Sequence, residues 1–336
     1  MPDRDYYFDN ARFILITLII AGHLLEPSIY SIPAFRGAYT FLYIFHIPAF
    51  VVISGHFAKN IRQKGKLRRI FMRTVPSYIL LQTAYAVLLF YLNGDSRLNL
   101  NFIRPIWVLW YLPALFLWYL MLLVISRLRF FPALICSLLI SLSAGLSSWI
   151  GYDFTLSRAL VFFPYYLVGY YLDIEQLRLM WNKHARALAV TISVAALGFT
   201  LYYATGFNPR VLYGSSPYSF FNVSPLEGMA TRTGTYAAGF LMVLVFFSLV
   251  PRGRLFFTSM GARSIYAYVL HGALLLIMRR SRVYDYIDTG LMGFLLLALA
   301  LALAFLLTSR TVERLAWPLV RPADLSAWFS RRGKAQ

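Results

Sequence analysis

Four ionisable residues stand in the first apolar segment of the chain, where a hydrocarbon surrounding would penalise each of them. In FDNARFILITLIIAGHLLEP (residues 8–27), Asp9 precedes Arg12 by three positions and His23 precedes Glu26 by three. Residues three apart are neighbours on a helix, so each acidic residue can pair with its basic partner. Arg12 and His23 are separated by close to three helical turns, which puts them on one face about 16 Å apart. A carboxylate beside an imidazole can make it a general base or a nucleophile.

This charged face has to meet protein or water rather than lipid. Arg12 taken alone is as consistent with an ordinary arginine at a helix end, whose long side chain reaches the membrane surface. The pair of His23 and Glu26 is different, because ionisable groups deep in a membrane span are functional by default. We therefore predict that His23 and Glu26 carry the chemistry.

Two more histidines are expected at the depth of His23. His46 stands near the expected outer end of the second apolar segment, and His271 stands near that of the ninth. Each by itself fits a hydrogen bond between helices as well as a chemical role. Together they predict a cluster of imidazoles in the outer half of the protein. Their spacing lacks the His-x-x-x-His pattern and only one deep carboxylate accompanies them, so no metal site is predicted.

The composition identifies an integral membrane protein. Of 336 residues, 60% are hydrophobic and only 13% are charged, which is too apolar for a soluble protein. Apolar runs long enough to cross a bilayer as helices recur along the whole chain. We predict an all-α, polytopic single domain over residues 1–336 with about ten spans: 11–30, 40–58, 73–92, 106–126, 130–149, 157–172, 186–204, 234–250, 258–278 and 289–309.

The formal charge of +19 indicates topology rather than nucleic-acid binding. The basic residues are spread over short loops between spans instead of along one soluble face, so no nucleic-acid partner is expected. They favour one set of loops, which by the positive-inside rule places both termini and the short basic tail 322–336 in the cytoplasm. The cluster RRSR at 279–282 runs against this rule, and it could instead meet an anionic substrate outside.

Two loops have functional readings beside plainer ones. The inner loop KNIRQKGKLRRIFMR (residues 59–73) is the strongest basic feature and includes Arg68 and Arg69. It fits anionic headgroups of membrane lipids, or an acidic cytoplasmic cofactor such as coenzyme A. The outward segment 205–233 is rich in Gly, Pro, Ser and aromatic residues, which predicts a folded loop over the outer mouth. Its aromatic groups suit sugar binding, or anchoring at the membrane interface.

Several stretches resemble the acyltransferase-3 family of multispanning transferases. The first helix of that family is marked by an Arg, ten residues and a His, which Arg12 and His23 match, and Asp9 matches its usual acidic residue. IFHIPAFVVISG (44–55), LWYL (109–112) and GARSIYAYVLH (261–271) are similar to later segments of the family, so the resemblance covers nearly the whole chain. His46-Ile47-Pro48 looks closest to the fucose 4-O-acetylase-like subgroup. Phe13 departs from the Gly that often follows the Arg.

The resemblance implies a membrane-bound O-acyltransferase, most often an O-acetyltransferase. Such proteins move an acyl group from cytoplasmic acyl-CoA, commonly acetyl-CoA, to a hydroxyl of a cell-envelope carbohydrate or lipid-linked glycan, here in the cytoplasmic (inner) membrane of a bacterium. Catalytic roles then fall to His23, Glu26, His46 and His271 as base or nucleophile and supporting groups. The residues expected to bind the donor are Asp9, Arg12, Ser54, Arg68, Arg69 and Arg263. Those expected to bind the acceptor are Trp110, Tyr111 and Tyr268.

Two other classes of function remain beside this one. A transporter or flippase of a sugar lipid or small polar solute would line its path with the same buried charges. Such a protein often has inverted repeats with broken helices in both halves, and no repeat is evident in this sequence. A membrane sensor or scaffold would instead use the inner basic loop 59–73 as its functional part.

Overall fold

The computed structural model describes residues 5–287, 290–320 and 322, and in this part of the chain helices are joined by loops and turns, without a strand. The all-α prediction is therefore confirmed. The α-helices are α1 Tyr6–Leu25, α2 Pro33–His56, α3 Lys66–Asn93, α4 Tyr111–Ile125, α5 Phe130–Ala144, α6 Leu156–Tyr171, α7 Ile174–Arg178, α8 Lys183–Tyr202, α9 Pro225–Leu249, α10 Thr258–Gly261, α11 Ser264–Arg280, α12 Gly290–Leu307 and α13 Arg310–Val320. Apart from Pro322, the predicted basic tail lies outside the described residues.

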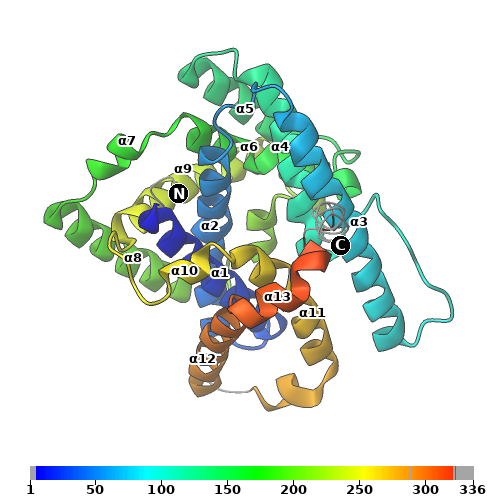
Figure 1. Cartoon of the computed structure of the whole chain (residues 1–336). Coiled ribbons are helices and arrows are strands. Elements are labelled where there is room, and N and C mark those ends of the chain that lie inside the picture. Colours follow the sequence, from blue (N-terminus) through cyan, green and yellow to red (C-terminus); the bar gives the residue numbers. More distant parts are fainter. Residues whose placement is uncertain (1–4, 288–289, 321, 323–336) are drawn as a thin grey trace.

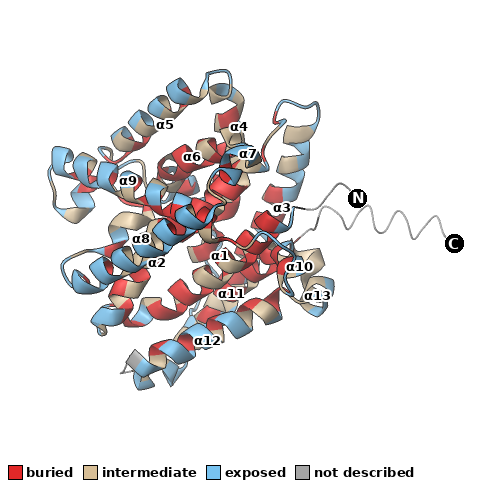
Figure 2. Cartoon of the chain, turned by 90° about the vertical axis from the view of Figure 1, so that its left-hand side faces the viewer, coloured by how far each residue is buried: buried red, intermediate tan, exposed pale blue. Residues whose placement is uncertain are grey.

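The first helix lies at the centre of the bundle. It packs against α2, α10, α11 and α12, and Figure 1 shows it surrounded by elements from both ends of the chain. Of its most apolar 18-residue window 72% is buried, against 11% for α8. Figure 2 shows the same contrast between the interior α1 and the outer α5 and α8. The residues of α1 are therefore held by packing on every side, while α8 offers its surface to lipid.

The predicted spans each overlap a helix, but the count of ten stays a prediction. Six helices are long and apolar enough to cross a membrane, and a seventh span results if the pair α12 and α13, bent by 72°, counts as one. The helices α5, α6 and α11 contain 15, 16 and 17 residues. At 1.5 Å per residue they fall short of a hydrocarbon layer of about 30 Å.

The sequence prediction was wrong about where two of the helices begin. The segment 205–233 is not a loop to its end, because α9 begins at Pro225. Ser224 and Glu227 form a capping box around that proline, which starts the helix in polar sequence that hydropathy does not register. The ninth span is also broken, because α10 ends at Gly261 and α11 begins only at Ser264.

Close packing of α2 against α6 depends on two glycines. A Cβ atom on Gly169 would collide with the carbonyl of Val52, and one on Gly55 would collide with the carbonyl of Tyr166. Glycine at both positions lets the two backbones touch, as small residues do in membrane bundles. The contact fixes α2, and with it His46 and Ser54, against the rest of the bundle.

Candidate active site

His23 is held by a carboxylate at the end of α1. Its Nδ1 lies 3.0 Å from Oε2 of Glu26. Beyond Leu25 the chain continues as the 3₁₀ turn Glu26–Ser28, which keeps Glu26 on the side of His23. A carboxylate only accepts hydrogen bonds, so Nδ1 carries the proton and the lone pair of the imidazole is at Nε2. Glu26 therefore fixes both the orientation of the ring and the position of its basic nitrogen.

Arg279 completes this arrangement from α11. Its Nη2 donates to the same Oε2 of Glu26 at 2.6 Å and lies 3.4 Å from the carbonyl oxygen of His23. Its guanidinium stacks over the ring of Trp107 at 4.3 Å, and Trp107 contacts the ring of His23 edge-on. In the sequence, Arg279 belongs to the RRSR cluster, an exception to the positive-inside rule that could instead meet an anionic substrate. The structure brings it to the predicted catalytic pair.

The second predicted imidazole, His271, lies directly beside the first. The rings of His23 and His271 are stacked with centroids 5.6 Å apart. Nδ1 of His271 lies 2.9 Å from the carbonyl oxygen of Ala267, so this nitrogen must be the donor. Its Nε2 is buried and has no hydrogen-bond partner among the residues that the structure describes. His271 is thus a neutral imidazole that offers a lone pair.

The third predicted imidazole, His46, is connected to His23 through Tyr43. It is fully buried, with Nδ1 2.5 Å from the carbonyl oxygen of Leu42. The ring of Tyr43 contacts it edge-on, and the Tyr43 hydroxyl lies 3.4 Å from Nδ1 of His23. Unlike His23 and His271, His46 lines none of the cavities described next. Its position suits support of Tyr43 better than contact with a substrate.

Three cavities follow one another along the bundle and share lining residues. The Glu26 cavity, of about 80 Å³, and the His271 cavity, of about 30 Å³, share His23 and Trp110. The His271 cavity and the Arg12 cavity, of about 280 Å³, share Tyr111 and Tyr268. Together they form a row of cavities from the Arg12 end of α1 to the Glu26 end, called the passage below. Its smallest cavity lies beside the two stacked imidazoles.

Two of the predicted donor residues, Arg12 and Ser54, line the Arg12 cavity. Arg12 pairs with Asp9, a third predicted donor residue, at 3.3 Å and lies over the ring of Phe57 at 4.2 Å. Ser54 shares a hydrogen bond of 2.7 Å with the hydroxyl of Tyr111. The cavity therefore combines a cation from α1 with a hydroxyl from α2.

The other predicted donor residues do not line that cavity. Arg263 directs its Nε to the carbonyl oxygen of Thr308 at 2.5 Å, at the end of α12. Arg68 and Arg69 are exposed in the first turn of α3. On the same inner loop, Lys59 pairs with Asp173 at 2.5 Å and holds the pKa of that carboxyl below its usual range. The basic loop is thus partly engaged within the protein.

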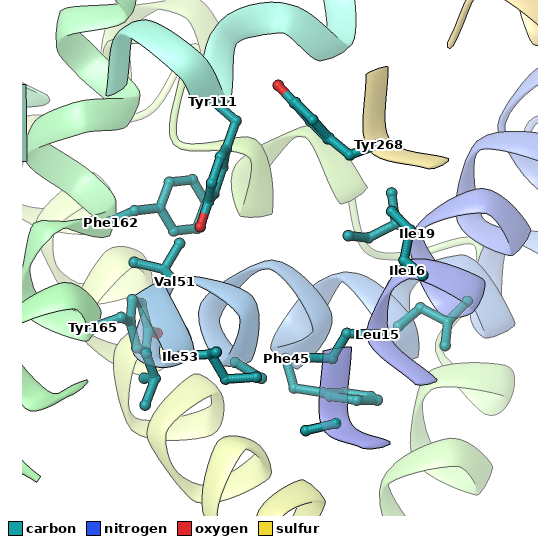
Figure 3. Close-up of a cluster of buried hydrophobic side chains, with 14 of the residues drawn as sticks. Leu15, Ile16, Ile19, Phe45, Val51, Ile53, Tyr111, Phe162, Tyr165 and Tyr268 are labelled. Atoms are coloured by element: carbon teal, nitrogen blue, oxygen red, sulfur yellow. The ribbon is translucent and has the colours of Figure 1, made fainter. Parts of the chain in front are cut away.

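The three aromatic residues expected to bind the acceptor line the passage at different depths. Trp110 belongs to its Glu26 half, whereas Tyr111 and Tyr268 stand where the His271 and Arg12 cavities join. The rings of Tyr111 and Tyr268 are 5.8 Å apart, and the Tyr268 hydroxyl donates to the carbonyl of Val108 at 2.6 Å. Figure 3 shows Tyr111 reaching from α4 toward α2. Both tyrosines thus line the His271 and Arg12 cavities, and their role in acceptor binding stays a prediction.

Sequence reasoning missed Asn10, which anchors the start of α1 to the segment around the start of α10. Asn10 is fully buried and donates to the carbonyl oxygens of Pro251 and Gly253, both at 2.9 Å, while its own amide oxygen accepts from Thr258 at 2.6 Å. Next to it, Gly261 allows the backbone of α10 to touch that of Asp9. An uncharged residue beside a conspicuous Asp9 gave no signal, although a buried amide needs such partners.

A further cation at the Glu26 cavity was also missed. Arg158, in the first turn of α6, lines this cavity and lies over the ring of Trp110 at 5.0 Å. In the sequence it looked like one more loop arginine at a span end. As for metals, no group of three or more His, Cys, Asp or Glu residues in the described part of the chain could hold an ion. The metal-free site stays a prediction.

Comparison with known proteins assigns the fold to a family. A family model for an acyltransferase domain (Acyl_transf_3) matches residues 5–309, nearly the whole chain. The chain belongs to the acyltransferase-3 family. The resemblance in the first helix and in the later segments is thereby confirmed, and the chain is an integral membrane protein.

Two curated relatives match over shorter stretches. The nodulation protein NolL of Sinorhizobium fredii is 33% identical over 134 residues, which are 34% of this chain and 36% of the relative. The nodulation protein NolL of Mesorhizobium japonicum is 42% identical over 65 residues, which are 17% and 16% of the two chains. The chain thus spans at most about a third of the curated relatives it matches. No solved structure matches it.

Proposed function

We propose that this protein is a membrane-bound O-acyltransferase that moves an acyl group, first of all acetyl, from acyl-CoA to a hydroxyl of a cell-envelope or exported carbohydrate. The observation that carries this proposal is the position of His23. Its imidazole is oriented by Glu26, and it lines both the Glu26 cavity and the His271 cavity. A basic nitrogen thus stands at the narrow point of a passage that opens toward a cation at each end.

The donor would enter at the Arg12 cavity. Arg12 is only part of a phosphate site, and Arg68 and Arg69 of the inner loop would supply further charge to the nucleotide of acyl-CoA. The slender thioester arm would then pass Ser54 and Tyr111 toward His23, over the length of about three helical turns. By the distribution of basic loops this end faces the cytoplasm, in the inner membrane of a bacterium, where membrane lipids surround the bundle.

At His23 the acceptor hydroxyl would give its proton to Nε2 as its oxygen attacks the thioester carbon. The carbon–sulfur bond then breaks, and the departing thiolate takes the proton back from the imidazolium, which leaves an O-acyl sugar and free CoA. Glu26 stabilises the imidazolium that forms in between. Alternatively, Nε2 attacks the thioester carbon and expels the CoA thiolate; the sugar hydroxyl then takes the acyl group from Nε2, and its proton goes to the thiolate.

The neighbouring groups fit an orienting role better than stabilisation of the oxyanion. The proton of His271 is at Nδ1, which donates to Ala267, so its Nε2 can only accept a hydrogen bond. The hydroxyl of Tyr268 already donates to Val108. His271 can therefore hold a second hydroxyl of the acceptor, and Trp110 offers an aromatic face to the sugar ring.

The small volume of the His271 cavity favours acyl transfer over transport of a sugar or sugar lipid as the function. Its volume of about 30 Å³ makes it the smallest of the three cavities. A thin acyl arm can enter such a space, but a sugar or sugar lipid could not cross it without a large rearrangement. A transporter or flippase, the alternative function, would need that rearrangement in every cycle.

The test is transfer in a defined system. Protein in proteoliposomes is given labelled acetyl-CoA on the Arg12 side, and envelope sugars from cells with and without the protein are compared by mass spectrometry. Loss of an O-acetyl group in its absence supports the proposal. Sugar movement without acyl transfer would overturn it. Incubation without acceptor separates the two routes, because only an acyl-histidine intermediate leaves label on the protein.

A further inference from the structure

The Glu26 cavity contains a cation, Arg158, that forms no ion pair with a carboxylate in the described part of the chain. Arg158 lies between two aromatic rings, 5.0 Å from the centroid of Trp110 and 5.6 Å from that of Tyr152. Within the described residues no carboxylate comes within 4.0 Å of its guanidinium. The rings hold the guanidinium in place, but they leave its five N–H donors available.

The other groups around this cavity do not supply the missing charge. Glu26 is already matched by Arg279 at 2.6 Å, in addition to its bond with His23. Tyr43 and Tyr213 line the same wall, and Tyr213 shares a hydrogen bond of 2.6 Å with Tyr39. Burial raises the pKa of Tyr213, so it stays uncharged at neutral pH. Glu26, Arg279 and Arg158 taken together therefore leave one positive charge in excess at this cavity.

We propose that the acceptor carries an anionic oxygen group, a phosphate or a carboxylate, which Arg158 binds while a hydroxyl of the same molecule lies at His23. The inference rests on the proposed function and names the class of acceptor. Arg158 and His23 line one cavity, so a single small molecule can reach both. The planar guanidinium suits two parallel hydrogen bonds to such a group.

An apolar groove lies next to this cavity and has room for the lipid chain of an anionic, lipid-linked acceptor. The groove, of about 790 Å³, lies between α8 and α9 and meets the Glu26 cavity at Leu212. The hydroxyls of Thr40, Thr200 and Thr235 in its wall are bonded to backbone carbonyls of their own helices, which leaves the lining apolar. Along α8 it extends over about 16 Å, half of a bilayer.

A lipid-linked glycosyl phosphate fits this arrangement, with its chain in the groove and its phosphate at Arg158. A soluble glycosyl phosphate presents the same oxygen chemistry without the chain. The two sources share the Arg158 site and differ only in their use of the groove. The groove variant Gly234→Trp, which adds bulk in its wall, therefore separates them.

Binding is measured first, because it does not depend on turnover. Full-length protein in nanodiscs is titrated by calorimetry with the 1-phosphates of glucose, galactose and fucose, and with the methyl glycosides of the same sugars. We expect the phosphates to bind at least about tenfold more tightly, as one charge-assisted pair allows. Arg158→Gln should remove this preference and Arg158→Lys should keep part of it. Arg104→Gln, which removes an exposed arginine paired with Asp153, should leave it intact.

Equal affinity for both forms, or a preference that survives Arg158→Gln, overturns the inference. Transfer assays then compare a polyprenyl-linked glycosyl phosphate with its soluble counterpart. If Gly234→Trp lowers transfer only to the lipid-linked form, the lipid is the source. If the variant and the wild type transfer equally well to both forms, the acceptor is a soluble one. An equal loss with neutral and anionic acceptors in Arg158→Gln would make Arg158 merely structural. Phosphate binding without acyl transfer in the wild type would instead refute the proposed function and keep the anion site.

Discussion

His23 and Arg279 bind the same oxygen atom of Glu26. Nδ1 of the histidine lies 3.0 Å from Oε2 and Nη2 of the arginine 2.6 Å from it, although the two residues are 256 positions apart. The carboxylate therefore joins the first helix to α11, which also carries His271. Its charge serves two partners at once, and removing it affects both.

Replacing Glu26 by Gln should lower the rate of acyl transfer by about 10- to 100-fold. The amide keeps a hydrogen-bond acceptor for His23, but it no longer offsets the imidazolium charge and leaves Arg279 without its carboxylate. Steady-state assays should show the loss in kcat with little change in KM for acyl-CoA. The matched control is Glu175→Gln, at an exposed carboxylate paired with Arg178, which should transfer normally. An undiminished kcat in Glu26→Gln would exclude the carboxylate from catalysis.

His23→Ala should reduce transfer by at least about 10²-fold, the usual contribution of a positioned base. His184→Ala, at an exposed histidine in the first turn of α8, is the control for loss of any imidazole. Both variants should elute from size-exclusion chromatography as the wild type does, because neither removes a large apolar contact. Normal turnover in a folded His23→Ala protein would be incompatible with the assignment.

Arg12→Ala should weaken donor binding by about tenfold, the value of one charge-assisted hydrogen bond. The dissociation constant of a non-hydrolysable acyl-CoA analogue measures this directly, separately from chemistry. Arg127→Ala removes an exposed arginine between α4 and α5 and should change it little. If Arg12→Ala binds the analogue as tightly as the wild type, Arg12 does not belong to the donor site.

Gly169→Ala should lower stability by about 1–3 kcal/mol, the usual penalty for overpacking. The added methyl group meets the carbonyl of Val52, so α6 has to move away from α2. Gly198→Ala is the matched control on α8, where a new Cβ has no atom within 4 Å. Thermal unfolding in detergent should show a lower Tm for Gly169→Ala than for the wild type and no decrease for Gly198→Ala. Equal Tm values would mean that the α2–α6 contact is looser than described.

The local part of the site could be predicted, because helical spacing alone puts His23 beside Glu26 and Asp9 beside Arg12. The partners that come from distant helices could not. Arg279 and Arg158 lie far from Glu26 in the sequence, and only the folded chain brings Arg279 to Glu26 and Arg158 to the Glu26 cavity. Their positions depend on how α6 packs against α2 and how α11 packs against α1, which hydropathy does not encode.

The fold shows the same division. Long apolar runs gave each predicted span a helix, since in a membrane the backbone has to satisfy its own hydrogen bonds. The start of α9 depends on the cap at Ser224 and Glu227, and the amphipathic helix α13 has too many polar residues to stand out as apolar. Capping and amphipathic segments follow from local chemistry that an average over a window removes.

The small His271 cavity also limits ion leakage through the protein. A water-filled channel from the Arg12 cavity to the Glu26 cavity would let ions run down the membrane potential, which drives each charge by about 2.3 kcal/mol per 100 mV. The small cavity beside His23 and His271, of about 30 Å³, denies an ion its hydration shell. The constriction that would admit only a thin acyl arm in the proposed function would therefore also keep ions from leaking through the protein in an energised membrane.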